Sequence, residues 1–247
     1  MIYNYQITIE YDGTKFVGWQ YQKNGNSVQE TVEKRLKKFF KKEIKIIGAG
    51  RTDAGVHAIG QCANFLIDKK IDNTKSFLNS INFFLRKDLI SIVEIKKRKI
   101  DFNSRYNAKE RFYEYKIINR QSELVLEKNK AWLIKQKLDI NLLKKGAKIL
   151  EGKHDFSTFR SSSCSAKSPV KKITKIKIAK KSKLILIQFK SKSFLQNQVR
   201  SMVGCLKYLA CRKWDLKNFK KVLKSKNRKL CAPPAPACGL YLQKVIY

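Results

Sequence analysis

The stretch Gly48–Gly60, GAGRTDAGVHAIG, interrupts strand-like sequence and sets the organisation of the first half of the chain. Apolar runs stand on both sides of it, EIKIIG before and QCANFLI after, and both are typical of β-strands. The stretch holds four glycines, one arginine, one aspartate and one of the chain's two histidines. Because loops on a rigid scaffold often carry function, Asp53 is the first candidate for chemistry.

The sequence around this loop predicts an α+β domain. Upstream, YQITIEY alternates apolar and polar residues with the period of a strand. Ser27 and Glu30 have the spacing of a helix capping box, and apolar residues then recur every three or four positions. Downstream, residues 73–88 predict a second helix and residues 89–97 a further strand. Strands and helices in this order favour a sheet covered by helices on one face.

The second half of the chain repeats this pattern, which suggests an internal duplication. Its expected elements are a strand at 111–119, a helix at 140–152 that Gly152 ends, a hairpin of 170–180 with 183–190, a long helix at 193–213, a shorter helix at 215–226 and a closing strand at 239–247. Residues 160–169, RSSSCSAKSP, are expected to form a mobile basic loop. No Pro- or Gly-rich linker separates the two halves.

Charge is the most unusual property of the composition. The 55 Lys and Arg residues outnumber the 19 Asp and Glu residues, which gives a net charge of +36. Such an excess indicates a polyanionic partner, either a nucleic acid or an anionic membrane surface, unless it reflects a general lysine bias of the source. No apolar run is long enough to span a membrane, and the N-terminus does not resemble a secretory signal. We therefore expect a cytoplasmic protein that binds nucleic acid.

The six cysteines do not predict a metal site. None of them forms a C-x-x-C pair, and neither histidine stands near a cysteine cluster. In a reducing cytosol they are expected to be small buried apolar residues.

The residues of the glycine-rich loop leave the role of Asp53 open. Ionised, its carboxylate can act as a nucleophile or a base, and Arg51 would favour that ionised form. An aspartate in a turn more often accepts backbone hydrogen bonds, and no second carboxylate nearby indicates a paired-carboxylate hydrolase. His57 lacks a supporting Ser or Cys nucleophile, so we expect a structural or an RNA-contacting histidine.

Six blocks of sequence occur in a particular order along nearly the whole chain. They are YDGTKFVGWQ, GRTDAGVHAIGQ, FNSRYNAKERFYEY, GKHDFSTF, FLQNQVRSMVG and APACGLYL. Together they resemble the tRNA pseudouridine synthase A family, and the RTDAGVHA block is highly specific for it.

This resemblance implies two ferredoxin-like (RRM-like) halves, residues 1–105 and 106–247, in an α+β fold. They would form a mainly antiparallel sheet with helices on one face and a central basic cleft, which the second half completes. The implied activity is isomerisation of uridine to pseudouridine in the anticodon stem-loop of tRNA. The family works as a homodimer and uses no metal or cofactor.

The resemblance also implies roles for individual residues. Asp53 falls on the nucleophile of the family. Tyr113 falls on the tyrosine that contacts the target uracil, and Arg200 on the arginine that pairs with the catalytic carboxylate. Arg51 is similar to the arginine that helps to hold the flipped-out nucleotide, and Leu240 to an apolar residue that lines the uracil pocket.

Such an isomerisation fits a site with a single carboxylate. The N1–C1′ bond breaks, the base rotates and C5 is joined to the sugar, so nothing is oxidised and nothing is lost. A covalent adduct of Asp53 at either C1′ or C6 divides one hard step into two. A base must then remove the C5 proton, and both Asp53 and Tyr113 are candidates. The target base must first leave the stack, which suits an aromatic and apolar pocket.

One position departs from the family, and two other classes of protein compete with an enzyme. Lys171 stands where the family more often has arginine, and lysine cannot make the same forked contact. A non-catalytic RNA-binding module or assembly factor would share the basic charge, but it has no need of the RTDAG loop. A membrane-surface binder would need an exposed amphipathic helix. Residues 28–42 come closest, but their apolar face is better used in the core.

Overall fold

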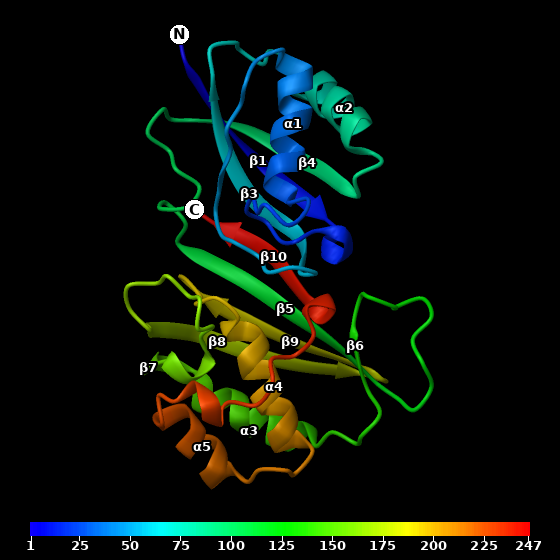
Figure 1. Cartoon of the computed structure of the whole chain (residues 1–247), viewed down its shortest axis with the longest axis vertical. Helices are drawn as coiled ribbons and strands as arrows, with labels where there is room; N and C mark the ends of the chain where they lie inside the picture. The colour runs from blue at the N-terminus through cyan, green and yellow to red at the C-terminus, as the bar shows by residue number, and fades with distance from the viewer. The chain divides into compact units, whose positions relative to one another are not determined.

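The computed structural model describes residues 1–247, and the chain folds into two compact units. The first unit comprises Met1–Lys109 together with Leu242–Tyr247, and the second comprises Glu110–Tyr241. Figure 1 traces the ten strands and five α-helices of the chain. The boundary between the two halves was expected after residue 105, with the closing strand in the second half. In the structure the end of that strand belongs to the first unit.

The first unit has the element order and strand order of a ferredoxin-like fold. Its elements are β1 (Tyr3–Tyr11), α1 (Val28–Phe40), β2 (Ile47–Gly48), β3 (His57–Ile67), α2 (Thr74–Leu85) and β4 (Ile90–Arg98). β1 lies between β4 and β3 and pairs antiparallel with both, and β2 pairs antiparallel with β3. The end of β10 (Leu240–Ile246) also lies beside β3. There Gly60 approaches the backbone of Gln243 too closely for a side chain.

Two amphipathic helices, α1 and α2, cover one face of this sheet (Figure 1). The Ser27 side chain accepts a hydrogen bond from the Glu30 N–H (3.2 Å), which confirms the start predicted from the capping box. Asn73 caps α2 in the same way through the Ser76 N–H. The core positions of the two helices are buried: Val28, Val32, Leu36, Phe77, Ile81 and Leu85. Each such side chain stabilises the fold by about 1.5–3 kcal/mol.

The second unit repeats the order strand, helix, two strands and helix, with additional elements. The repeated elements are β5 (Glu110–Asn119), α3 (Ile140–Leu150), β8 (Val170–Lys181), β9 (Leu184–Ser191) and α4 (Gln198–Ala210). The additions are β6 (Trp132–Ile134), β7 (Gly152–Asp155) and α5 (Leu216–Lys224). The strand order is β5-β9-β8-β7, with β6 parallel to β5 and the other pairs antiparallel. The predicted hairpin and the Gly152 stop (φ 103°) are therefore confirmed.

The long helix predicted at 193–213 is shorter in the structure. α4 begins at Gln198, because its N-cap Asn197 has a left-handed backbone (φ 61°) and the preceding residues form a turn. The buried Gln198 side chain accepts the Leu195 N–H (2.8 Å) and stabilises this turn. Val199, Val203 and Leu206 form its buried stripe. None of the five helices is long and apolar enough to cross a membrane.

Two other segments differ from their predicted form. The apolar run before the loop forms only the two-residue strand β2, although Ile44 and Ile46 are buried. The side chains of Ile44 and Ile46 fill the core, although their backbone does not pair with a neighbouring strand. The serine-rich loop at 160–169 is held by hydrogen bonds: Arg160 donates to the Cys164 carbonyl (2.7 Å), and the Ser161 N–H donates to the Gln196 carbonyl (3.0 Å). Its basic residues thus serve partly to order the loop.

Candidate active site

The loop that carries Asp53 connects β2 to β3 and is fixed by backbone hydrogen bonds. The Trp19 N–H donates to the Thr52 carbonyl (3.1 Å), and Gly18 and Asp53 form an isolated antiparallel bridge. The Val56 N–H donates to the Asp53 carbonyl (3.2 Å), which closes a turn. Asp53 itself is half-buried. Its carboxylate is therefore presented from a backbone with little freedom to move.

Two glycines of the YDGTKFVGWQ block let the chain approach this loop closely. A Cβ at Gly13 would lie 2.0 Å from the Val56 carbonyl oxygen. A Cβ at Gly18 would lie 2.7 Å from the Thr52 carbonyl oxygen, and Gly18 has a φ of 118°, which few other residues adopt. The first block thus acts as a backbone support for the second.

Gln61 is a supporting residue that the sequence reasoning missed. Its side chain is fully buried, and its Nε2 donates to the Gly50 carbonyl (2.8 Å). The Tyr11 hydroxyl lies 2.8 Å from Thr52 Oγ1 and supports the next turn of the loop. A glutamine inside an otherwise apolar strand run was the signal in the sequence, because a buried amide needs partners.

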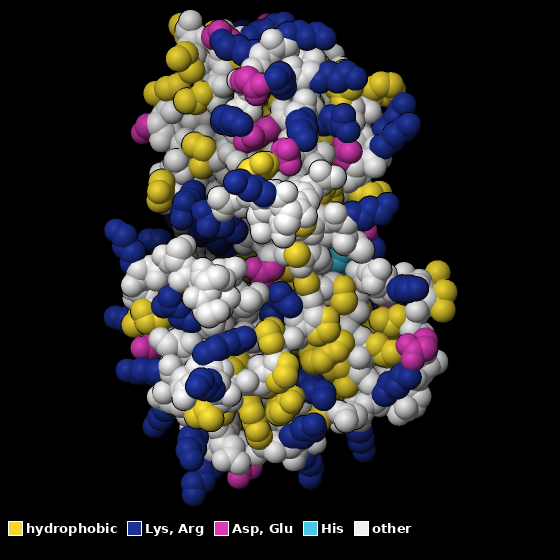
Figure 2. All heavy atoms as spheres, viewed as in Figure 1, with side chains coloured by type: hydrophobic (Ala, Val, Ile, Leu, Met, Phe, Trp, Pro, Cys, Tyr) yellow, Lys and Arg dark blue, Asp and Glu magenta, His cyan; other side chains and the backbone are white.

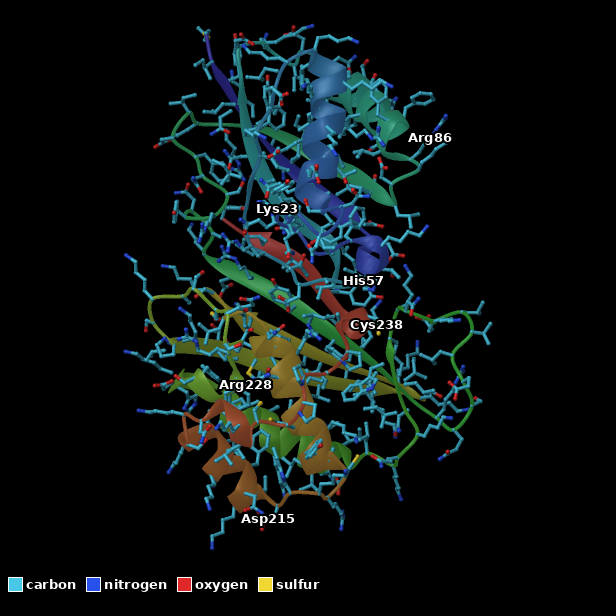
Figure 3. The ribbon with its side chains drawn as sticks, in the orientation of Figure 1. Lys23, His57, Arg86, Asp215, Arg228 and Cys238 are labelled. Carbon is cyan, nitrogen blue, oxygen red and sulfur yellow. The ribbon has the colours of Figure 1, made fainter.

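His57 is a structural residue at the start of β3, where Figure 3 labels it. Only 2% of its surface is exposed, so the RNA-contacting alternative does not fit. Its Nδ1 lies 3.1 Å from both the Gly13 nitrogen and Asp12 Oδ1. The Gly13 N–H has only this ring nitrogen as its acceptor here, whereas Asp12 Oδ1 also accepts from Thr14 (2.6 Å). We therefore assign a neutral ring whose Nδ1 accepts from Gly13.

Arg51 stands two residues before Asp53 on the same loop. Its side chain is exposed, whereas Asp53 is half-buried. The backbone around Thr52 and Asp53 follows a narrow path along Gly18, which leaves Arg51 facing solvent. An exposed guanidinium on this loop is suited to a phosphate ligand.

Tyr113 lies in β5 of the second unit, opposite Phe189 of β9. It is 8% exposed, and its ring meets the Phe194 ring edge-on at 5.2 Å between centroids. Tyr115, two residues further, is fully buried, and its hydroxyl donates to the Pro236 carbonyl (2.7 Å). Burial raises the pKa of Tyr115. Tyr115 is thus tied to the protein through its hydroxyl, and the Tyr113 ring packs against that of Phe194.

Arg200 lies in the first turn of α4 and is held by the segment that follows α5. Its Nε donates to the Ala235 carbonyl (2.8 Å), and the Ala235 N–H donates back to the Arg200 carbonyl (3.0 Å). Its Nη1 also donates to Asn197 Oδ1 (3.2 Å). Arg200 is half-exposed. Its orientation is thus fixed at two points.

Leu240 begins β10, directly after a turn that packs on Tyr115. It is 5% exposed. A Cβ at Gly239 would lie 2.6 Å from the Tyr115 ring, so this turn and β5 are in close contact. Segment 235–240 therefore connects Arg200 and Leu240 to the strand that carries Tyr113. Lys171, where arginine is more usual, lies in β8 opposite His154 and is half-buried.

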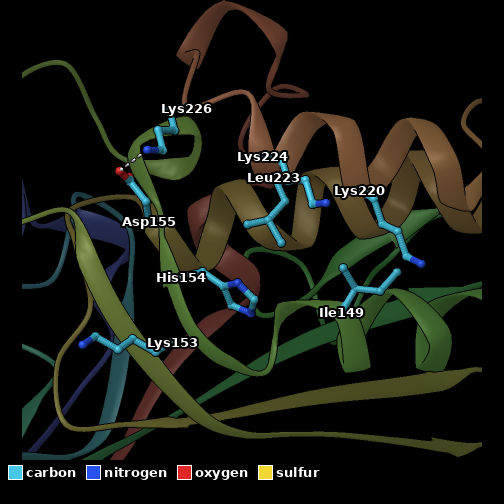
Figure 4. A pocket seen from close by; sticks show the side chains of 8 residues that line it. All are labelled: Ile149, Lys153, His154, Asp155, Lys220, Leu223, Lys224 and Lys226. Atoms are coloured by element: carbon cyan, nitrogen blue, oxygen red, sulfur yellow. Dashed lines mark ion pairs between the residues drawn. The ribbon is translucent and has the colours of Figure 1, made fainter.

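A basic groove of about 580 Å³ lies elsewhere on the second unit, between β7 and α5 (Figure 4). Its lining residues are Ile149, Lys153, His154, Asp155, Lys220, Leu223, Lys224 and Lys226. Lys226 forms an ion pair with Asp155 (3.7 Å), the only acidic residue of the lining. Lysine and arginine side chains also cover much of the face of both units drawn in Figure 2. No group of three or more His, Cys, Asp or Glu side chains is placed to hold a metal ion.

The fold, the supported aspartate loop and the basic surface agree with one family of RNA-modifying enzymes. A family model described as tRNA pseudouridine synthase matches two stretches of the chain, residues 7–107 and 147–247. The first stretch lies within the first unit, and the second begins inside α3 and runs to the end of the chain. The chain belongs to the tRNA pseudouridine synthase family, and it is therefore an isomerase that acts on tRNA.

Relatives of known name cover the full length of the chain. A tRNA pseudouridine synthase A of Pelagibacter ubique is 57% identical over 246 residues, which is 100% of both chains. Proteins of the same name from Parvibaculum lavamentivorans and Maricaulis maris are 44% and 40% identical and span 98% of this chain and 98% and 97% of their own. The family expected from the six sequence blocks is confirmed.

Proposed function

We propose that Asp53 is the nucleophile that converts uridine to pseudouridine in the anticodon stem-loop of tRNA. The observation that carries this proposal is the construction of its loop. A single half-buried carboxylate is presented by a backbone that Gly18, Trp19 and Gln61 hold in place. An aspartate that merely stabilised a turn would not need such support from two other segments of the chain.

The chemistry needs a carboxylate at one fixed position. Its attack on the nucleoside gives a covalent adduct, the N1–C1′ bond breaks, and the base rotates so that C5 meets C1′. The C5 proton then leaves and N1 gains a proton, so the reaction is an isomerisation with no net loss. A carboxylate that is held in one position lowers the barrier, because it does not have to reorganise during these steps.

We assign supporting roles to four further residues. Tyr113 contacts the flipped uracil. Its ring is fixed by the edge contact with Phe194, and a small part of its side chain stays exposed. Following the family resemblance, we give Arg200 the role of partner of the catalytic carboxylate and Leu240 that of an apolar wall of the uracil pocket. Arg51 contacts a phosphate of the flipped-out nucleotide, since its guanidinium faces solvent.

We further propose that the basic groove binds phosphates of the tRNA body, outside the stem-loop. Lys153, Lys220 and Lys224 line it, whereas Lys226 is partly neutralised by Asp155. Phosphate contacts of this kind position an RNA without reading its sequence, and their strength falls as salt rises. The groove would thus add affinity for whole tRNA rather than specificity for one uridine.

The family resemblance also supports a homodimer that works in the cytoplasm, without cofactor. Light scattering on the purified protein tests the dimer directly. A monomer at micromolar concentration would contradict it.

Tritium release from tRNA labelled at uridine C5 tests the nucleophile. We expect release by the wild-type protein and none by Asp53→Asn, with tRNA affinity unchanged in a filter-binding assay. Asp68→Asn is the matched control, because Asp68 forms only an exposed ion pair with Lys42. Retained release in Asp53→Asn would refute the assignment. No release by the wild type from a complete unmodified tRNA pool would favour the RNA-binding module instead.

A further inference from the structure

Two cysteines of the second unit face each other where α4 contacts segment 228–235. Cys205 lies in α4 and is fully buried, whereas Cys231 follows the short helix η3 (Arg228–Leu230) and is half-buried. Both are thiols, and their sulfur atoms are 3.5 Å apart. A disulfide joins sulfurs at about 2.05 Å, so the two would have to approach by about 1.5 Å.

The surroundings give the two thiols different reactivity. Arg228, labelled in Figure 3, donates from Nη1 to the Ser201 hydroxyl (2.8 Å) beside the pair. The hydrogen bond from Cys205, with Arg228 and Ser201, lowers the pKa of Cys231. The hydrogen bond with Cys231, together with burial, raises the pKa of Cys205. Cys231 is thus suited to react first with an oxidant, and Cys205 to resolve the product.

Three of the other four cysteines have oxygen neighbours instead of a second sulfur. Cys62 lies near Thr8 Oγ1 and the Gly60 carbonyl, Cys211 near Gln136 Oε1, and Cys238 near the Ala131 carbonyl. Burial raises the pKa of all three. Cys62 is buried as expected, whereas Cys211 and Cys238 are only partly buried, and none of the three has a second thiol beside it.

The pair is mechanically connected to Arg200. Segment 228–235 continues from Cys231 to Ala235, which holds Arg200 through two hydrogen bonds. Between them, a Cβ at Gly204 of α4 would lie 2.1 Å from the Pro233 carbonyl oxygen, so the segment is in backbone contact with the helix. A movement of Cys231 toward α4 must therefore shift the residues that orient Arg200.

We propose that Cys205 and Cys231 form a peroxide-sensitive modification site that closes to a disulfide and displaces the segment holding Arg200. The Cys231 thiolate attacks one oxygen of hydrogen peroxide, which gives a sulfenic acid and, after proton uptake, water. The Cys205 sulfur then attacks the sulfenic sulfur and a second water leaves. Two thiols and one peroxide thus give one disulfide and two waters, and a reductant reverses the change.

Peptide mapping of the oxidised full-length protein tests the site. After hydrogen peroxide treatment and trypsin, we expect a disulfide between the peptides 201–207 and 230–244, with fragmentation placing it on Cys231 and not on Cys238. Cys231→Ser should abolish it, and the matched control Cys211→Ser should keep it. In Cys205→Ser, dimedone should trap a sulfenic acid at Cys231. Absence of the cross-link, or its persistence in Cys231→Ser, would overturn the proposal.

The effect on activity rests on the proposed role of Arg200 and is measured separately. Tritium release by the oxidised wild type should fall about tenfold or more, because ångström-scale displacement of a positioning group is costly, and should recover with reductant. Cys231→Ser should keep its rate under peroxide. A disulfide that forms with no change in rate would overturn the connection to Arg200. A protein without synthase activity before oxidation would refute the proposed function and leave the mapping result intact.

Discussion

The buried amide of Gln61 donates to the carbonyl oxygen of Gly50 at 2.8 Å, three residues before Asp53. The same side chain accepts the Cys62 N–H through its Oε1 (3.1 Å). One residue of β3 is therefore joined both to its own strand and to the loop in front of it. The position of the loop relative to the sheet depends on this side chain.

Replacing Gln61 by Met should keep the volume and remove the donor. The half-buried Gly50 carbonyl then loses this donor, which costs about 1–3 kcal/mol of stability. Urea unfolding should show this loss, and turnover should fall further because Asp53 is less well held. Gln121→Met is the control, because Gln121 makes its hydrogen bond to the Lys135 carbonyl on the exposed surface. Equal stability loss in both variants would show that Gln61 has no special supporting role.

Gly13→Ala should disturb the Asp53 loop from the other side. The new methyl group would lie 2.0 Å from the Val56 carbonyl oxygen, so the backbone must move. We expect a loss of about 1–3 kcal/mol, as for other overpacked sites, together with lower turnover. At Gly25 the nearest atom is instead the end of the Val17 side chain, which can rotate. Gly25→Ala should therefore stay within about 0.5 kcal/mol of wild type, and the reverse ranking would contradict this view.

Most elements of the fold follow from the sequence because their signals are local. The capping box at Ser27 and the left-handed stop at Gly152 act within a few residues, and both predictions were right. The start of α4 was wrong because the left-handed backbone of Asn197 leaves no trace in an apolar pattern that continues through it. The apolar run before the loop also predicted a longer strand than β2, because its apolar residues fill the core without pairing in the sheet.

The candidate site divides in the same way. Asp53 was recognisable from its loop and from the family blocks. The supports of the loop were not, because Gly13 and Gln61 act through contacts with residues far along the chain. The burial of His57 likewise depends on Gly13, and the pairing of Cys205 with Cys231 on how segment 228–235 packs on α4. The spacing of residues along the sequence does not reveal any of these contacts.

Tyr113→Phe should separate binding from chemistry. The phenylalanine ring keeps the edge contact with Phe194, so tRNA affinity should stay near that of wild type. If the Tyr113 hydroxyl takes part in removing the C5 proton, as we expect, tritium release falls about 10²- to 10⁴-fold. Unchanged release would leave Asp53 as the base.

Tyr115→Phe provides the matched comparison for that variant. Its hydroxyl donates to the Pro236 carbonyl, so the change should cost about 1 kcal/mol of stability. A larger loss of tritium release in Tyr115→Phe than in Tyr113→Phe would reverse the two roles.

Asp139 should make the stability of the protein depend on pH in the acid range. It caps α3 by accepting the Leu142 and Asn141 N–H groups and pairs with Arg212. The hydrogen bond from Leu142, followed by that from Arg212, lowers the pKa of Asp139. A folded-state pKa below the unfolded value adds stability above the unfolded pKa, about 3.9, and loses it as pH falls through the folded value.

Asp139→Asn retains a capping oxygen but not the charge. Wild type should therefore be more stable than the variant near neutral pH, and the difference in urea midpoints should shrink toward zero as pH falls to about 2. A difference that stays constant over this range would show that the charge of Asp139 contributes nothing.

Charge reversal in the basic groove should weaken the binding of whole tRNA and spare the isolated stem-loop. Lys220→Glu with Lys224→Glu removes two cations from the lining, and each lost phosphate contact should lower the slope of log K against log salt by about 1. The control, Lys69→Glu with Lys75→Glu, changes the net charge equally at exposed sites on the first unit. Filter binding over a salt series with both RNAs distinguishes the cases. Equal weakening by the two double variants would mean that overall charge, and not the groove, attracts tRNA. Equal weakening for tRNA and stem-loop would place the groove contact on the anticodon arm.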